Sequence, residues 1–202
     1  MTTLWTRIIT RASKTIYDKC EVIVFCAPPW NEAESSKIEA EVIPVVQSHG
    51  SIDLPPFVHG VEHEFGRRMA WKSRRDDVCY LLLLDGLGVG FGWARTTGKI
   101  KIEEIGLSLA LDSSQVCLFD FFIAPSVRGR GLYTRLLREI RRRSTKKSVL
   151  IYADSWNVPS LAGISAAGFS AHACVRGLTL FGGRFPTGVS LFAKSGLAAL
   201  PQ

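Results

Sequence analysis

The sequence lacks the motifs of several common sites. It contains no Cys-x-x-Cys pair, and His63-Glu64 is not followed by the second histidine of a zinc-binding helix, so we expect no metal site. The cysteines are odd in number and far apart, at Cys20, Cys26, Cys79, Cys117 and Cys174. This spacing does not suit a disulfide framework. It favours reduced, buried thiols, and we therefore expect a cytoplasmic protein.

Long apolar runs are also missing. Asp85 and several glycines interrupt the longest one, so no segment is predicted to span a bilayer. The chain has 202 residues, of which 47% are hydrophobic. That length and composition predict one folded domain with a full core. We expect residues 1–75 and 76–202 to be two parts of that domain.

Basic residues outnumber acidic ones, with a formal net charge of +7. This excess favours an anionic partner: nucleotide phosphates, nucleic acid or a membrane surface. Much of it lies at 138–147, at the end of a predicted helix, where cations complement the helix dipole. A solvated helix end is the simpler interpretation. A second basic helix is predicted over 4–16; we expect it to pack on its own domain, with a membrane or targeting role left open.

Hydrophobic patterning predicts a protein with both strands and helices. Strands are predicted at 21–27, 41–46, 99–111, 169–181 and 189–193, with a hairpin over 78–94 that turns at Asp85-Gly86 and a helix over 58–72. The 99–111 segment is expected to be the hairpin partner of the central strand. Glycines alternate at 86, 88, 90 and 92, which leaves one strand face without side chains and favours close packing there.

The central stretch, 117–143, predicts a strand, a turn and a helix. Apolar residues run from Cys117 to Ile123, interrupted only by Asp120, and Pro125 ends the run. A basic turn, Arg128-Gly129-Arg130-Gly131, follows. The helix after it is expected to bury Leu132, Tyr133, Leu136, Leu137 and Ile140 and to expose Arg135, Arg138, Arg141 and Arg142.

The basic turn suits a phosphate. Glycines allow the backbone to approach a ligand closely, and the start of a helix presents unpaired N–H groups and a partial positive charge. The turn is not a P-loop, because no Gly-Lys-Ser/Thr follows. It is not a dinucleotide fingerprint, because Thr134 stands where the third glycine belongs. A plain strand-to-helix connection with solvent-facing arginines is the alternative.

A second segment follows at the right distance. Residues 148–169 predict a strand, then Asn157 as a helix cap with Pro159 in the first turn, then a helix ended by Gly168-Phe169. Together the two segments resemble the acetyl-CoA-binding region of the GNAT acyltransferases, whose pattern is Arg/Gln-x-x-Gly-x-Gly/Ala after a strand. Arg128 and Gly131 match that pattern, and Tyr133 replaces its last small residue. The resemblance covers about 78–181.

The resemblance implies an α+β fold: a mixed, mostly antiparallel sheet, splayed at the cofactor site, with helices on both faces. It implies acetyl-CoA or another acyl-CoA as co-substrate. The residues expected to hold it are Phe122, Ile123, Arg128, Gly129, Arg130, Gly131, Leu132, Tyr133, Asn157 and Ser160. A backbone N–H near Ile123 is expected to polarise the thioester carbonyl. Residues 1–75 are expected to form the acceptor side.

The catalytic residues are less evident. Asp120 and Asp154 are candidate bases, although a structural carboxylate is an equal alternative for each. The family often has a tyrosine, the acid, seven residues after the motif's Asn, but this chain has Ile164 there. Tyr152, Ser155 or Ser160 is a candidate substitute, or the thiolate leaves unassisted.

The leading hypothesis is a CoA-dependent N-acyltransferase, acting on a small amine or an amino sugar by direct attack in a ternary complex. A domain that binds acyl-CoA without turnover is the alternative, suggested by Ile164. Nucleic-acid binding through 138–147 is a third hypothesis, although no aromatic residues are interleaved there.

Overall fold

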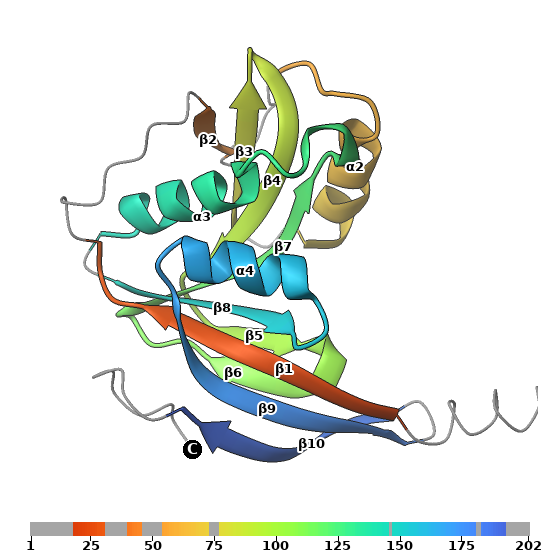
Figure 1. The fold of residues 1–202 in the computed structure, drawn as a ribbon, viewed down its shortest axis with the longest axis vertical. Helices are drawn as coiled ribbons and strands as arrows, with labels where there is room; N and C mark the ends of the chain where they lie inside the picture. Colours follow the sequence, from red (N-terminus) through yellow and green to blue (C-terminus); the bar gives the residue numbers. More distant parts are fainter. Residues whose placement is uncertain are drawn as a thin grey trace, which may run out of the picture.

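One long, twisted sheet organises the protein (Figure 1). The computed structural model describes residues 18–30, 40–45, 54–72, 77–145, 147–180 and 183–192. The basic helix predicted over 4–16 lies outside these ranges. The strands of the main sheet run in the order β10-β9-β1-β8-β7-β4-β3-β2. Among the strands that the structure describes in this sheet, β7 and β8 alone pair in parallel, and the other neighbours pair antiparallel.

The strand bounds follow the predicted runs closely in most places. They are β1 Asp18–Ala27, β2 Glu41–Val45, β3 Asp77–Leu84, β4 Leu87–Arg95, β5 Lys99–Ile102, β6 Leu107–Ala110, β7 Gln115–Ile123, β8 Ser148–Asp154, β9 Ser170–Leu180 and β10 Gly183–Leu191. The hairpin of β3 and β4 turns at Asp85-Gly86, as predicted, and both of these residues have positive φ. The mixed, mostly antiparallel α+β architecture is confirmed.

The 99–111 prediction is wrong in two respects. The segment forms two strands, β5 and β6, separated by the 3-10 helix η1 (Glu103–Ile105), and these pair with each other in a separate sheet. The central strand β7 pairs instead with β4 and β8. The two consecutive acidic residues of η1 break the alternation, and Gly106 then turns the chain back with φ 64°. Residues 99–110, which form β5, η1 and β6, therefore make a small flap that packs on the main sheet.

Helices cover both faces of the sheet. The three α-helices within the described ranges are α2 (Val61–Lys72), α3 (Leu132–Arg143) and α4 (Val158–Ala166). On one face, the Phe65 ring of α2 lies edge-on against Phe91, with ring centroids 5.5 Å apart. On the other, the Tyr133 ring of α3 lies edge-on against Phe121. In Figure 1, α3 and α4 lie together over the same side.

Glycines in β4 allow the layers to pack closely, as predicted. A Cβ at Gly88 would lie 2.4 Å from the Phe57 ring, and a Cβ at Gly92 would lie 2.1 Å from the Phe121 ring. Phe57, which packs on Phe65 of α2, and Phe121, which packs on Tyr133 of α3, therefore occupy the space that these glycines leave.

The buried apolar residues form two clusters. The larger one runs between the sheet and its helices, and includes Leu136, Leu137 and Ile140 of α3. The smaller one joins β1 and β9 to η1, through Val22, Val24, Ile102, Ile105, Ala173 and Val175. This second cluster fixes η1 to the sheet face opposite α4.

Arg141 corrects the prediction for α3. It was expected on the exposed face but is only 2% exposed. Its guanidinium lies 5.1 Å from the centroid of the Trp30 ring and donates to the carbonyl of Pro28 at 3.5 Å. The contact depends on the loop after β1, more than a hundred residues away in sequence, so helical periodicity gave no sign of it.

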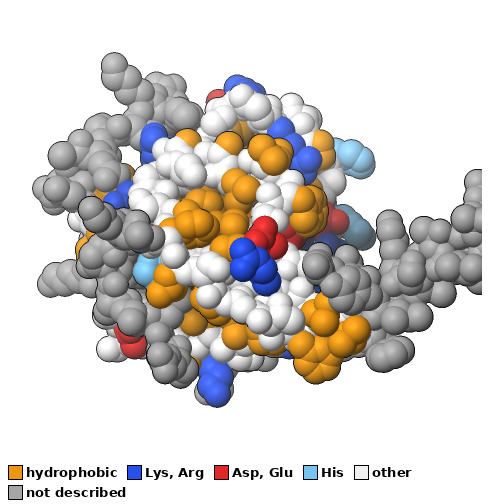
Figure 2. Space-filling model, turned by 60° about the horizontal axis from the view of Figure 1, so that its bottom comes forward, with side chains coloured by type: hydrophobic (Ala, Val, Ile, Leu, Met, Phe, Trp, Pro, Cys, Tyr) orange, Lys and Arg blue, Asp and Glu red, His pale blue; other side chains and the backbone are white. Residues whose placement is uncertain are grey.

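The far end of the sheet carries exposed apolar side chains. Phe185, Val189 and Leu191 of β10 are more than half exposed. Figure 2 turns this end toward the viewer and shows apolar side chains beside charged ones. No helix in the described ranges is long and apolar enough to cross a membrane. None of the five cysteines forms a disulfide in the described structure, and all but Cys20 are buried.

Candidate active site

The two central strands separate halfway along their length. β7 and β8 pair from Gln115↔Ser148 as far as Leu118↔Ile151. Beyond that point β7 continues beside β4 to Ile123, and β8 continues beside β1 to Asp154. The parallel strands therefore splay apart, as expected, and leave an edge of each without a strand partner.

The backbone of Ile123 faces this opening. The N–H of Ala124 donates to the carbonyl of Val89 at 2.8 Å, on the β4 side. Because successive N–H groups in a strand point to opposite sides, the N–H of Ile123 points toward β8, into the splay. The carbonyl of Ile123 accepts a bond from Nε of Arg128 at 3.0 Å.

A bulge marks the start of the opening. The register of β7 with β4 shifts between the pairs Trp93↔Phe119 and Phe91↔Phe122, and Asp120 there has φ 53°. The Asp120 carboxylate forms an ion pair with Arg68 of α2. The Arg68 guanidinium also lies 5.5 Å from the centroids of the Phe91 and Phe122 rings. The ion pair with Arg68 therefore connects Asp120 in β7 to α2.

The basic turn leads directly into α3. Gly131 is the N-cap residue of α3, with φ 73°, and has no side chain to occupy the first-turn N–H groups. No acidic residue lies in that first turn. Around Gly129, with φ 77°, a Cβ would meet nothing within 4 Å. This open helix start suits an anionic group.

A cavity of about 560 Å³ adjoins the turn. Of the residues expected to hold the cofactor, its lining includes Phe122, Ile123, Arg128, Gly129, Gly131, Leu132, Tyr133, Asn157 and Ser160. Arg130 is exposed and lies outside this lining. Asn157 caps α4 as predicted, accepting from the backbone N–H of Ser160 at 3.3 Å.

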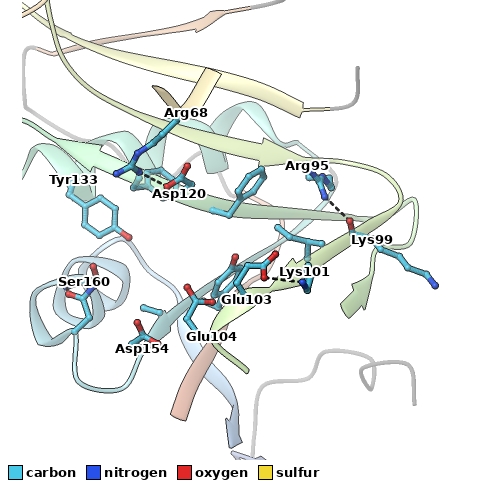
Figure 3. A pocket seen from close by; sticks show the side chains of 16 residues that line it. Arg68, Arg95, Lys99, Lys101, Glu103, Glu104, Asp120, Tyr133, Asp154 and Ser160 are labelled. Carbon is cyan, nitrogen blue, oxygen red and sulfur yellow. Dashed lines mark hydrogen bonds and ion pairs between the residues drawn. The ribbon is translucent and has the colours of Figure 1, made fainter. Parts of the chain in front are cut away.

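A second cavity, of about 580 Å³, lies on the α2 and η1 side (Figure 3). Asp120, Tyr152 and Asp154, the three candidate catalytic residues, all line it. Its remaining lining includes Arg68, Arg95, Lys99, Lys101, Glu103 and Glu104, which sequence reasoning missed. Only Arg68 belongs to the first 75 residues, so within the described ranges the charged wall comes chiefly from the flap. In the sequence, the adjacent acidic residues Glu103 and Glu104 were the one indication of this charged wall.

The two cavities meet at the splay. Phe121, Tyr133, Asn157 and Ser160 line both of them. Figure 3 shows the Tyr133 hydroxyl directed into the second cavity, on the side of Ser160. Gly163 of α4 gives the Tyr133 ring its space, because a Cβ there would lie 2.5 Å from Cδ1 of the ring. Tyr133 therefore stands at the neck between the cavities.

Burial shifts the acidity of the groups around this neck. It raises the pKa of the Tyr133 phenol, an effect that a hydrogen bond with Ser160 partly offsets. It also raises the pKa of Tyr152, with a further increase from Cys117, Glu104 and Asp120. The pKa of Asp154 is raised by desolvation too, against a hydrogen bond from Cys20 and the charge of Arg184. Both phenols therefore stay protonated at neutral pH, and Asp154 is a stronger base than an ordinary aspartate.

Comparison with protein families identifies the fold. Residues 47–169 match the model of the acetyltransferase (GNAT) family. The chain belongs to the GNAT acetyltransferase family. Residues 117–169 of the matched region contain the splay, the basic turn and the Asn157 cap.

Solved structures agree on the fold of this GNAT protein. A conserved protein of unknown function from Staphylococcus epidermidis matches with a TM-score of 0.53 and 10% identity, over 87% of this chain and 66% of that one. A GNAT-family protein from Novosphingobium aromaticivorans, described as an acetyltransferase, matches with a TM-score of 0.52 and 14% identity, over 85% and 66%. The chain thus covers just under two thirds of each of these relatives. No curated protein matches.

Proposed function

We propose that this GNAT protein transfers an acetyl or other acyl group from CoA to a primary amine, by direct attack in a ternary complex. The observation that carries the proposal is the pair of cavities that meet at Tyr133 and Ser160, across the splay of β7 and β8. One cavity suits the acyl-CoA and the other the acceptor. Each substrate then reaches the neck from its own side.

The cofactor side fits an acyl-CoA. The glycine turn and the uncapped start of α3 suit the pyrophosphate, with Arg128 beside them. The unpaired edge of β7 suits the amide groups of pantetheine, which would extend the sheet as a short added strand. The N–H of Ile123 then lies where a thioester carbonyl oxygen needs a donor.

The transfer step requires few protein groups. The amine nitrogen attacks the thioester carbon, the N–C bond forms, the C–S bond breaks, and the electron pair stays on sulfur as CoA leaves. The nitrogen gives up a proton, and we assign Asp154 to accept it, directly or through water. Burial raises its pKa, whereas Asp120 already pairs with Arg68. Positioning of the two substrates supplies much of the rate.

The hydroxyl at the neck comes from α3. Ile164, at the place of the family's usual tyrosine, is fully buried and cannot reach the substrates. Tyr133 fills the neck instead, with its hydroxyl beside Ser160. We assign Tyr133 to donate a hydrogen bond to the departing sulfur. Its raised pKa keeps the phenol protonated for that purpose.

Calorimetric titration with acetyl-CoA, CoA and longer acyl-CoAs tests the cofactor side. Gly131→Ala and Gly131→Glu strain the same positive φ, at a cost of about 1–2 kcal/mol, but only the glutamate places a negative charge at the turn. We expect Gly131→Glu to abolish binding and Gly131→Ala to weaken it less.

Turnover decides between an enzyme and a sensor. CoA release in the presence of amines supports the transferase. Acyl-CoA binding without turnover of any amine would support the sensor alternative, which the burial of Ile164 favours. If the wild type binds no CoA species, the proposal fails.

A further inference from the structure

The wall of the second cavity carries equal numbers of basic and acidic side chains. Its basic residues are Arg68, Arg95, Lys99 and Lys101, and its acidic residues are Glu103, Glu104, Asp120 and Asp154. These charges differ in whether the protein itself already neutralises them. That difference determines which charges are left for a ligand.

Most of the cations already have anionic partners. Arg95 donates two hydrogen bonds to Asp77, at 2.7 and 2.6 Å, and a third to the carbonyl of Lys99 at 2.6 Å. Lys101 forms a salt bridge with Glu103 at 3.0 Å. Arg68, as described above, pairs with Asp120. In Figure 3 the Lys99 side chain extends away from the other labelled residues.

In contrast to these cations, Glu104 has no oppositely charged partner among the residues that the structure describes. Among the residues that the structure describes, its buried Oε2 has no hydrogen-bond partner, and no cation forms a salt bridge with it. Native proteins pair almost all of their buried polar atoms, because an unpaired one retains its full desolvation cost. A carboxylate in this state at a cavity wall points to a cationic ligand that compensates it.

The protein holds Glu104 firmly in this place. The next residue, Ile105, is fully buried, and its side chain packs against Gly177 of β9, where a Cβ would lie 2.7 Å away. Gly106 follows with φ 64°, and a Cβ there would lie 2.1 Å from the carbonyl oxygen of Arg184. The C-terminal end of η1 is therefore packed against β9 and β10, which limits how far the backbone at Glu104 can move before a ligand binds.

Glu104 and Asp154 line the same cavity but come from different elements. The carbonyl of Asp154 accepts from the N–H of Asn157 at 3.0 Å, which places Asp154 at the start of α4, near the neck. Glu104 lies on the flap, close enough to Tyr152 for its charge to affect that phenol. An amine at the neck must lose its proton before it attacks, whereas an ammonium held by Glu104 keeps its proton.

We infer that the acceptor carries a second positive charge besides the amine that is acylated, and that Glu104 binds this charge. This inference rests on the proposed function. It names the acceptor class as diamines or larger polycationic amines, and it makes Glu104 a specificity-determining residue. Asp154 serves the reacting amine, and Glu104 binds the second ammonium.

The test uses three amines of similar length that differ in the charge at the far end: putrescine, butylamine and γ-aminobutyrate. Their affinities are measured by calorimetry on the full chain saturated with CoA. We expect putrescine to bind about tenfold more tightly than butylamine, and γ-aminobutyrate to bind most weakly. Glu104→Gln should reduce the putrescine advantage to about twofold. Glu62→Gln, which removes an exposed carboxylate of α2 outside both cavities, should preserve it.

The outcomes separate this inference from the proposed function. If CoA binds but the wild type shows no preference for putrescine, the inference is wrong and the transferase proposal stands. The same follows if Glu104→Gln retains the full preference. If CoA itself does not bind, the proposed function fails first. The order of affinities in the wild type tests the inference even if the Glu104 variant does not fold.

Discussion

Gly163 shows how a single residue shapes the neck between the two cavities. A glycine inside a helix is ordinarily unfavourable, so its replacement by alanine should stabilise α4. Here the new Cβ would lie 2.5 Å from the Tyr133 ring, which cannot move without disturbing its contact with Phe121. The clash should outweigh the gain in helix propensity.

We expect Gly163→Ala to destabilise the protein by roughly 1–3 kcal/mol and to weaken acetyl-CoA binding. Urea unfolding and calorimetry measure the two effects. Gly66→Ala is the matched control, because Gly66 also lies inside a helix but a Cβ there meets nothing within 4 Å. That variant should gain roughly 0.5–1 kcal/mol. Equal gains at both sites would mean that Gly163 leaves room for a side chain.

Asp154 connects acidity to stability. Because burial raises its pKa in the folded protein above the ordinary value of 3.8, the native state holds this proton more tightly than the unfolded state. The stabilisation is fully present below pH 3.8 and is lost as pH rises through the folded pKa. At neutral pH the folded protein therefore bears the cost of an ionised carboxylate at this partly buried position, and Asp154→Asn removes that cost.

We therefore expect Asp154→Asn to unfold at a higher urea concentration than the wild type at pH 7, with a smaller difference at pH 4. If the acyl-transfer assignment is right, the same variant loses most of its turnover. A variant that is less stable at pH 7 would show that the carboxylate has a stabilising partner instead.

Individual residues were predictable where the signal was local. The Asn157 cap and the glycine turn follow from backbone chemistry within a few positions, and both are present as expected. The roles of Arg141 and Glu104 depend on contacts with distant segments, at Pro28 and at β9. Nothing in their immediate sequence context indicates such contacts.

At the scale of elements, η1 matters more to the site than its three residues suggest. It carries Glu103 and Glu104 into the cavity, and Ile105 anchors it in the smaller hydrophobic cluster with Val22 and Val175. Ile105→Ala should therefore cost about 2–5 kcal/mol of stability and also loosen Glu104. We expect the KM for a diamine to rise while the affinity for acetyl-CoA stays nearly constant.

Ile140→Ala is the control for that variant. Ile140 is equally buried, but it lies in the larger cluster under α3, away from η1. Its loss should cost a similar amount of stability without the selective effect on the acceptor. If both variants raise the diamine KM equally, the effect comes from general destabilisation and not from η1.

The order of the strands was beyond what the sequence alone could predict. β1 was predicted as a buried strand, and it lies between β8 and β9, pairing with both. Its continuous apolar character indicates burial on two faces but does not identify its neighbours. The prediction for 99–111 was wrong for a related reason. The apolar alternation of this segment suited a strand of the main sheet, and only its packing on β9 shows that it forms a separate flap.

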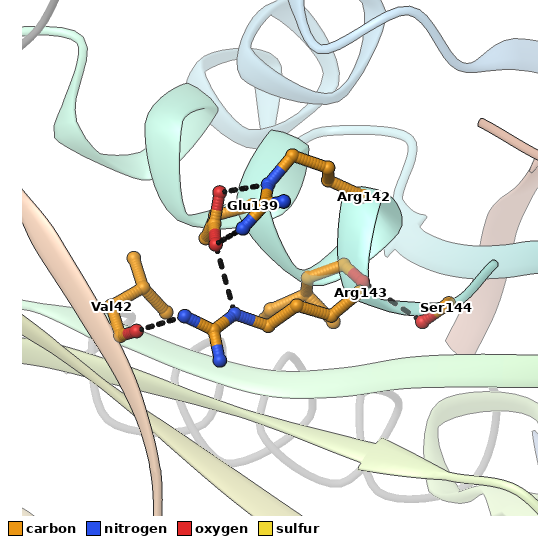
Figure 4. A network of polar contacts seen from close by, with 6 residues as sticks. Val42, Glu139, Arg142, Arg143 and Ser144 are labelled. Carbon is orange, nitrogen blue, oxygen red and sulfur yellow. Dashed lines mark hydrogen bonds and ion pairs between the residues drawn. The ribbon is translucent and has the colours of Figure 1, made fainter. Parts of the chain in front are cut away.

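At the scale of the whole molecule, net charge was a weaker guide than the position of each charge. The excess of +7 suggested nucleic acid as a possible partner. Figure 4 shows that Glu139 contacts both Arg142 and Arg143 at the basic end of α3. These ion pairs, with N···O distances of 2.7 and 2.9 Å, make that end a poor candidate for binding nucleic acid. Arg143 also donates to the carbonyl of Val42. Arg138 donates to the carbonyl of Ala166.

These contacts predict weak nucleic-acid binding that depends strongly on salt. Because the arginines already have protein acceptors, few of them are available to replace the counterions of a phosphate backbone, and a small number of phosphate contacts gives low affinity. We expect labelled duplex DNA and single-stranded RNA to bind measurably in fluorescence anisotropy only at low ionic strength, and not near 0.15 M salt, where screening acts within about 8 Å. Glu139→Gln should strengthen the low-salt binding, since it releases two guanidinium groups. Tight binding by the wild type at physiological salt would contradict this interpretation and make the end of α3 a functional surface in its own right.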